Sequence, residues 1–323
     1  MKILITGVAG YIGSVLARQL LDKNYDVVGL DSLNFGGESL SLLYNYQNFS
    51  FFNIDIRDVT MLRKIIRGVD SVVHLAAIVG DPACAKQPCL AKEVNWNASV
   101  NLYNTCEENN HIERFIFAST CSNYGKMNGK VYVTETSPLR PVSLYAELKV
   151  KFEKYILEKR SNSNIKPTAL RFATVYGLSP RMRFDLTVNE FMRDITLGRE
   201  LHIFGEQFWR PYCHVEDLAR SVVHTLEAPT DKVAYNVFGV GDTAENYQKK
   251  MIVEEILKIV PDGMIKYVKK DEDPRDYRVD FSKIKDELGY SITKRVPDGL
   301  KEIHEAIINK IIPNPDNPKY KNI

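Results

Sequence analysis

Tyr145 and Lys149 are the residues of this chain whose types and spacing best suit acid–base chemistry. They lie four positions apart in a helical pattern, and residues spaced by four share one face of a helix. A tyrosinate can take the proton of an alcohol whose carbon loses a hydride, and a nearby lysine ammonium lowers the pKa of the phenol. The pair therefore predicts a general base that acts on an alcohol.

Spacing alone does not select this pair, because Tyr155 and Tyr290 also precede a lysine by four positions. Only Tyr145 opens a helix soon after residues 119–125, Ser-Thr-Cys-Ser-Asn-Tyr-Gly, which follow a buried strand pattern. In an open parallel sheet, ligands bind beyond the carboxyl ends of the strands. We therefore predict that Thr120 holds the reacting hydroxyl, Tyr145 is the base and Lys149 is its partner. The alternative is an exposed helical pair.

A second group of residues is typical of a dinucleotide site. Gly7, Gly10 and Gly13 follow the first apolar strand pattern and open the first helix, with Tyr11 and Ile12 between them. Glycines at these positions let the backbone approach a pyrophosphate, whose charge then lies at a helix N-terminus. The alternative interpretation is a structural turn at the start of a helix.

Asp31 ends the second strand pattern, where a carboxylate accepts hydrogen bonds from the adenosine ribose and repels the extra phosphate of NADP. The predicted cofactor is therefore NAD, with Lys149 and Tyr145 at its nicotinamide ribose. Two short stretches after later strands are further candidates for contacts with adenine and the phosphates, although an ordinary loop explains each equally well. These residues are Asp55, Ile56, Leu75, Ala76 and Ala77.

Apolar and helical stretches alternate through the first half of the chain. This rhythm predicts an α/β fold with right-handed crossovers, namely a Rossmann doubly wound parallel sheet. The predicted strands are residues 2–6, 26–30, 49–54, 71–75, 114–118 and 168–172, and the predicted helices are 14–22, 59–67, 90–109 and 144–159.

Beyond residue 172 the alternation loosens, which favours a smaller C-terminal substrate-binding lobe. The predicted helices there are residues 188–197, 215–227, 247–260, 282–288 and 298–309. We expect an NAD-binding domain over 1–170 with a later contribution from about 210–240, and a substrate-binding lobe over 171–209 and 241–323. Residues 313–323, rich in proline and asparagine, are predicted to fray.

Composition excludes several classes of protein. Hydrophobic residues make up 44% and charged residues 26%, as in packed globular proteins, and a net charge of +2 predicts no nucleic-acid partner. No apolar run reaches the roughly 18 residues of a membrane span. The five cysteines include no C-x-x-C pair, which predicts free thiols, no metal site and a cytoplasmic location.

These motifs together resemble the NAD-dependent epimerase/dehydratase family of extended short-chain dehydrogenases/reductases. The resemblance covers nearly the whole chain and implies a Rossmann domain, a nucleotide-diphosphate sugar as substrate and a homodimer. The matching stretches, in family order, are Gly7–Gly13, Asp31, His74–Ala77, Ser119–Gly125, Tyr145–Lys149, Leu170–Gly177, Arg210–Asp217 and Asp280–Tyr290.

The resemblance also implies roles for residues that spacing alone does not single out. Asn95 matches an asparagine near the cofactor, and Thr174 stands in the substrate stretch. Arg210 and Arg275 match arginines that clamp the substrate diphosphate, which suits a planar fork of donors. Arg183, with Arg181, is a further candidate of the same kind. The alternative for these arginines is a surface ion pair with nearby acids.

Departures from the family pattern narrow the activity. Cys121 and Ser122 stand where 4,6-dehydratases carry acidic residues, and water elimination needs an acid and a base. The 3,5-epimerase/reductase branch has a cysteine two residues before Tyr124 and a later histidine, and neither occurs here. Thr174 and Pro211 replace the usual asparagine and aspartate.

The sequence thus predicts that bound NAD oxidises a ring hydroxyl of a nucleotide sugar, at C4, to a keto-sugar. A 4-epimerase and a C4-dehydrogenase both fit. Residues 119–125 and 181–187 are similar to a subgroup that includes nucleotide-heptose C4 oxidation. The alternative from a different class is a non-catalytic NAD-sensing module on the same fold.

Overall fold

The computed structural model describes residues 1–127, 131–159, 164–269 and 275–322. These residues form a seven-stranded parallel sheet in the order β10-β6-β5-β4-β1-β2-β3, which confirms the predicted Rossmann architecture. Its strands are β1 (Lys2–Thr6), β2 (Asp26–Asp31), β3 (Phe49–Asn53), β4 (Ser71–His74), β5 (Arg114–Thr120), β6 (Lys166–Phe172) and β10 (Asn236–Val240).

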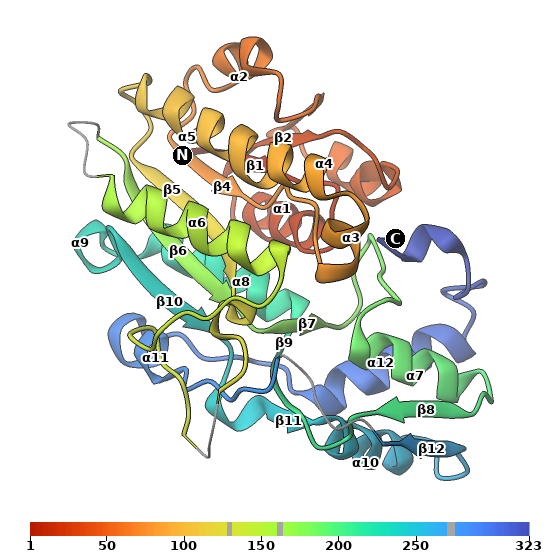
Figure 1. Ribbon diagram of the computed structural model, residues 1–323. Coiled ribbons are helices and arrows are strands. Elements are labelled where there is room, and N and C mark those ends of the chain that lie inside the picture. The colour runs from red at the N-terminus through yellow and green to blue at the C-terminus, as the bar shows by residue number, and fades with distance from the viewer. Residues whose placement is uncertain (128–130, 160–163, 270–274, 323) are drawn as a thin grey trace.

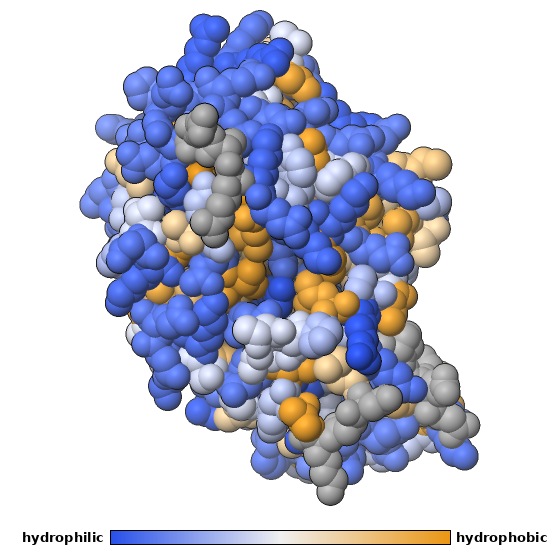
Figure 2. Space-filling model, turned by 60° about the vertical axis from the view of Figure 1, so that its left-hand side comes forward, coloured by the Kyte–Doolittle hydropathy of each residue, from blue (hydrophilic) through white to orange (hydrophobic). Residues whose placement is uncertain are grey.

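Helices cover both faces of this sheet because its strands are apolar on both sides (Figure 1). One face packs against α2 (Val59–Ile65), α5 (Ser99–Glu107) and α6 (Leu144–Glu158). The other face packs against α1 (Gly13–Asp22) and α8 (Val215–Glu227). Hydrophilic side chains dominate the face of the molecule shown in Figure 2, with hydrophobic ones reaching the surface in small patches.

The helix predicted over 90–109 is interrupted in the structure. It is divided into α4 (Pro88–Lys92), a π-helical segment over Glu93–Ala98, and α5. Within the wider turn, the Ser99 hydroxyl donates to the carbonyl of Val94 at 3.1 Å. Such π segments occur frequently at functional sites.

A second lobe follows β6 and contains short strands that the sequence pattern did not predict. They are β7 (Thr174–Tyr176), β8 (Leu201–Phe204), β9 (Trp209–His214), β11 (Asn246–Gln248) and β12 (Ile265–Val268), in sheets of order β11-β9-β7 and β12-β8. Three longer helices cover them: α7 (Thr187–Thr196), α10 (Lys249–Ile259) and α12 (Val296–Ile308). Two of them, β7 and β11, have only three residues each, too few to display an alternating pattern.

The remaining short helices connect these elements. They are α3 (Asp81–Lys86), α9 (Thr230–Val233), α11 (Ser282–Leu288) and the 3-10 turns η1 (Glu38–Asn45), η3 (Cys121–Tyr124), η4 (Thr243–Glu245) and η5 (Pro318–Tyr320). In the described ranges, no helix is long and apolar enough to cross a membrane. The predicted division into domains at residues 171, 210 and 241 stays a prediction.

The prediction that residues 313–323 fray is wrong for their described part, 313–322. The backbone N–H of Phe184 donates to the Tyr320 carbonyl at 2.8 Å, and the two rings make an edge-to-face contact at 5.7 Å. A composition rich in proline and asparagine indicated a loose end, but these contacts to a distant loop hold the segment in place.

Candidate active site

A cavity of about 1150 Å³ lies between the sheet and the second lobe. Its walls include residues that follow the carboxyl ends of β1, β2, β4, β5 and β6, the edge where an open parallel sheet binds ligands. The predicted site residues that line it are Gly7, Gly10, Tyr11, Ile12, Gly13, Asp31, Asp55, Ile56, Leu75, Ala76, Ala77, Thr120, Tyr145, Lys149, Thr174, Arg183, Arg210 and Arg275.

The glycine-rich turn leaves no room for side chains. A Cβ atom on Gly13 would lie 2.1 Å from the carbonyl oxygen of Gly7, and one on Gly7 would lie 2.8 Å from the amide nitrogen of Ala76. The backbone of the turn lines the cavity at Gly7, Gly10 and Gly13. Helix α1 begins at Gly13, so its N-terminus also lies at the cavity. This arrangement fits a pyrophosphate, as the spacing predicted.

Asp31 has a structural role that its position in the sequence did not reveal. Its carboxylate accepts hydrogen bonds from the backbone N–H groups of Ala9 at 3.0 Å and Leu33 at 2.9 Å. Burial raises the pKa of this carboxyl above its ordinary value. The same side chain that faces the cavity therefore also braces the glycine-rich turn.

Asn95, predicted near the cofactor, does not line the cavity. Its side chain accepts from the backbone N–H of Ile78 at 2.8 Å and donates to the carbonyl of Ile78 at 2.9 Å. Ile78 itself does line the cavity, so Asn95 fixes the position of a residue in the cavity wall.

Asp55 lines the cavity and forms an ion pair with Arg57 at 2.8 Å. The hydrogen bond from this guanidinium lowers the pKa of the Asp55 carboxyl.

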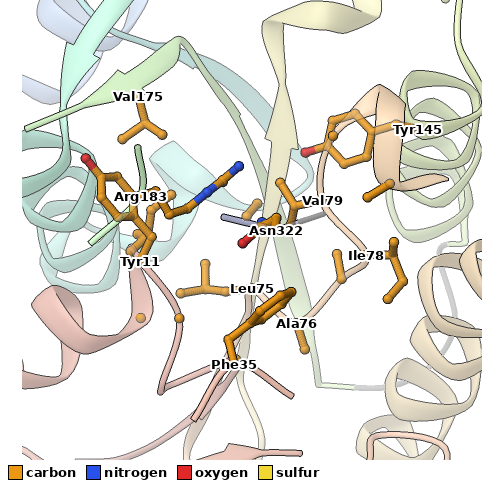
Figure 3. A pocket seen from close by; sticks show the side chains of 18 of the residues that line it. Tyr11, Phe35, Leu75, Ala76, Ile78, Val79, Tyr145, Val175, Arg183 and Asn322 are labelled. Atoms are coloured by element: carbon orange, nitrogen blue, oxygen red, sulfur yellow. The ribbon is translucent and has the colours of Figure 1, made fainter. Parts of the chain in front are cut away.

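Thr120, Tyr145 and Lys149 come together at one end of the cavity. Thr120 ends β5 and its hydroxyl oxygen accepts the N–H of Ser122 at 3.1 Å, whereas Tyr145 and Lys149 belong to α6. In Figure 3 the hydroxyl of Tyr145 points into the cavity. Ser143 caps α6 by accepting the N–H of Ala146, which fixes the helix start beside the base.

Burial governs the ionisation of this pair. The Lys149 ammonium donates to the carbonyl of Ala118 at 2.8 Å and lies 5.8 Å from the centre of the Tyr145 ring. Burial lowers the pKa of Lys149 to about 8 and raises the pKa of the Tyr145 phenol. This differs from the expectation that Lys149 lowers the tyrosine pKa: in the protein alone, desolvation of the phenolate is the larger effect.

A buried ion pair that the sequence analysis missed lies next to Ser119, the residue before Thr120. Arg171 of β6 donates to Glu153 of α6 at 2.6 Å, and their side chains are only 5% and 2% exposed. Glu153 also accepts the hydroxyl of Ser119 at 2.6 Å, and Arg171 donates to the hydroxyl of Tyr124 at 3.1 Å. The group ties β5, β6 and α6 together; the only signal for it was the place of Arg171 in the Leu170–Gly177 motif.

The predicted substrate residues lie on the second-lobe side of the cavity. Arg183 makes two hydrogen bonds to Asp185, at 2.6 and 3.0 Å, and Arg275 pairs with Asp81 at 2.9 Å. Although burial alone would raise the pKa of Asp185, the guanidinium of Arg183 lowers it. The Arg210 guanidinium lies 5.3 Å from the centre of the Tyr277 ring.

The cavity also contains residues that sequence reasoning did not single out. Most come from loops or from the end of the chain, where spacing carries no periodic signal. They include Phe35, Ile78, Val79, Val175, Leu186, Thr187, Tyr212, Lys249, Tyr277, Pro318, Lys319, Lys321 and Asn322. Arg181, considered with Arg183 in the sequence, also lines the cavity, and its guanidinium lies 4.4 Å from the centre of the Phe35 ring.

Comparison with known proteins agrees with this site. Residues 3–241 match the model of the NAD dependent epimerase/dehydratase family. An uncharacterized UDP-glucose epimerase of Bacillus subtilis is 35% identical over 241 residues, 71% of this chain and 73% of that protein. The UDP-glucose 4-epimerase of Lactobacillus helveticus is 30% identical over 276 residues, 80% of this chain and 82% of that protein.

A solved structure is also similar over nearly the whole length. The UDP-glucuronic acid 4-epimerase of Bacillus cereus, crystallised with UDP-glucuronic acid and NAD, superposes with a TM-score of 0.86 at 29% identity. The match covers 96% of this chain and 99% of that protein. The fold is therefore that of this solved epimerase.

Proposed function

The chain belongs to the NAD dependent epimerase/dehydratase family, and we propose that it is a UDP-sugar 4-epimerase. In this reaction the C4 hydroxyl of the sugar is oxidised with NAD, and the hydride returns to the opposite face of the 4-keto-sugar. The observation that carries the proposal is that Thr120, Tyr145 and Lys149 line the same cavity as the glycine-rich turn and Asp31.

The cavity residues fit NAD. The glycine-rich turn would hold the pyrophosphate, and Asp31 would accept hydrogen bonds from the adenosine ribose and disfavour NADP. Asp55 and Ile56 would border the adenine, while Lys149 and Tyr145 would contact the nicotinamide ribose. Leu75, Ala76 and Ala77 would let the phosphates pass closely. When bound there, NAD would accept the hydride.

The size of the cavity also fits two ligands. Its volume of about 1150 Å³ exceeds the 300–1000 Å³ typical of single small-molecule sites, which suits a dinucleotide beside a nucleotide sugar.

Three side chains would carry the proton chemistry. Thr120, whose hydroxyl is oriented by the N–H of Ser122, would align the sugar hydroxyl with Tyr145. Tyr145 would take the hydroxyl proton and return it after the sugar has turned. Burial raises the pKa of its phenol, so a positive charge is needed beside it, and the Lys149 ammonium, held by the carbonyl of Ala118, lies within reach.

The substrate would lie between these groups and the arginines of the second lobe. Arg210 and Arg275 would bind the diphosphate, because a guanidinium offers two parallel donors to phosphate oxygens. Arg183 would join them at the diphosphate, and Thr174 would contact the substrate. The similarity to enzymes named for UDP-glucose and UDP-glucuronic acid supports uridine diphosphate as the nucleotide part.

The test is to mix the purified protein with UDP-glucose, UDP-galactose, UDP-glucuronate and UDP-galacturonate while following NADH absorbance, then to identify the sugar by NMR. A 4-epimerase inverts C4 with no lasting rise in NADH. A lasting rise with a 4-keto-sugar would instead support the C4-dehydrogenase, the activity favoured by the similarity of residues 119–125 and 181–187 to the heptose-oxidising subgroup. The non-catalytic alternative is not favoured, because the similar proteins are enzymes.

We also propose that the protein acts as a homodimer in the cytoplasm. The family resemblance supports the dimer, and light scattering on the eluting protein measures it directly. All five cysteines are free in the structure, which supports a reducing compartment.

A further inference from the structure

The segment Pro318–Asn322 lies at the cofactor cavity, far in sequence from every residue predicted to bind NAD. Pro318, Lys319, Lys321 and Asn322 line the same cavity as Asp31 and Tyr145. In Figure 3, Asn322 appears among the cavity side chains, in the middle of the view. A segment in this position can contact part of a bound dinucleotide.

The second lobe holds this segment firmly. Besides the Phe184–Tyr320 contacts, the Arg181 guanidinium donates to the carbonyl of Lys321 at 3.2 Å. The backbone N–H of Asn322 donates to the Asp185 carboxylate at 3.3 Å, the same carboxylate that pairs with Arg183. The segment is therefore attached to the loop that carries Arg183, a predicted substrate-binding arginine.

The attachment to the NAD-binding side is weaker. Lys319 lies 3.8 Å from Glu38, which begins η1 soon after Asp31, and both side chains are largely exposed. Exposed ion pairs of this kind contribute little. The Arg181 guanidinium, which donates to the segment, also lies over the ring of Phe35 on this side. Among the described residues, the segment is thus held by several hydrogen bonds to the second lobe and by only one exposed ion pair to the NAD-binding side.

The Asn322 side chain has an unsatisfied hydrogen-bond acceptor that a bound cofactor could use. Its Oδ1 atom is buried and accepts no hydrogen bond among the described residues. A buried carbonyl oxygen at the wall of a cavity needs an N–H or O–H donor. Ribose hydroxyls and amide groups of a dinucleotide are such donors, whereas ionised phosphates are not.

We propose that Pro318–Asn322 is a strap that retains NAD and NADH in the cavity between catalytic steps, with Asn322 accepting a hydrogen bond from a ribose hydroxyl or the carboxamide. This inference rests on the proposed 4-epimerase function. An epimerase returns the hydride from the same cofactor molecule that received it, so escape of NADH would strand the keto-sugar. A strap across the cofactor prevents that escape.

The experiment measures the rate at which NADH leaves the full-length protein. NADH is bound, an excess of NAD is added, and the decay of NADH fluorescence is followed for wild type, Asn322→Ala, Tyr320→Ala and Asn314→Ala. Asn314 is an exposed asparagine four residues before this segment and does not line the cavity, so it is the matched control. We expect release about tenfold faster for Asn322→Ala, the effect of one lost hydrogen bond. Release should also be faster for Tyr320→Ala, which loses the ring contact with Phe184 that anchors the segment, and unchanged for Asn314→Ala.

Equal or slower release from Asn322→Ala and Tyr320→Ala, with unchanged thermal unfolding, overturns the strap; slower release would mean that the segment competes with the cofactor. Absence of NADH binding by the wild-type protein also overturns it. Binding is measured without sugar, so a protein that retains NADH through the strap but converts no UDP-sugar contradicts only the proposed 4-epimerase function.

Discussion

On the sheet side of the cavity, the polar groups next to Ser119 are buried and bonded to one another, whereas on the second-lobe side the arginines pair with carboxylates near the cavity itself. Arg171 and Glu153 are 5% and 2% exposed. Arg275 and Asp81 are 39% and 25% exposed, and both line the cavity. A ligand in the cavity cannot reach the Arg171–Glu153 pair, whereas it can contact Arg275 and Asp81.

The difference in burial between these two ion pairs suits two different roles in the site. Removing one partner of a buried pair leaves an uncompensated charge, so the Arg171–Glu153 pair keeps the reacting groups in one arrangement. Arg275 lies in a more exposed setting, where a diphosphate can replace its carboxylate partner at little cost. In the proposed function, the sheet would therefore position the reacting groups, and arginines of the second lobe would bind the substrate.

The largest expected effect is on the chemistry of the sheet side. Tyr145→Phe removes the base, so turnover should fall about 10²- to 10⁴-fold while NADH binding persists. Tyr155→Phe is the matched control on the same helix, since Tyr155 also precedes a lysine by four positions and bonds to Asn104 away from the cavity. Turnover by Tyr145→Phe close to that of Tyr155→Phe would rule out the proposed base.

The next effect concerns stability. Glu153→Gln should lower the free energy of unfolding by about 3–5 kcal/mol, because the buried Arg171 loses its charged partner. Asp185→Asn, on the second-lobe side, should cost less, about 1–3 kcal/mol. Urea denaturation measures both, and equal losses would remove the contrast between the two walls.

Acid should weaken the sheet side through His74. This side chain is buried between Thr6 and Ser99, and burial, followed by the charge of Lys149, lowers its pKa from 6.5 to about 3. The unfolded chain therefore binds a proton that the folded chain refuses, so stability is lost as pH falls from about 6.5 towards 3. His74→Gln should show a shallower decline in unfolding free energy over this range; parallel curves would contradict the assignment.

The smallest effect is expected for Arg183→Lys. Lysine keeps the charge but loses the two-pronged geometry seen with Asp185, so the KM for the UDP-sugar should rise about tenfold with kcat little changed. Arg199→Lys, in an exposed pair with Asp316, provides the control. A fall in kcat at constant KM would place Arg183 with the groups that act on the transition state instead.

The sequence by itself determined the features that depend on short covalent spacing. Gly7, Gly10 and Gly13 must lie in one turn, and Tyr145 and Lys149 must share one helix face, because the chain between them is only a few residues long. The alternation of strands and helices likewise set the parallel sheet, and with it the edge where these groups meet.

Only the tertiary structure decided which distant residues join them. Arg171 meets Glu153 through the pairing of β5 with β6, Asn95 turns its amide to Ile78 rather than to the cavity, and Asn322 reaches the cofactor wall from the end of the described chain. Such contacts depend on packing between elements far apart in sequence, where no spacing rule applies. For the same reason burial, which the sequence does not report, decided that the pKa of Lys149 is lowered and that of Tyr145 is raised.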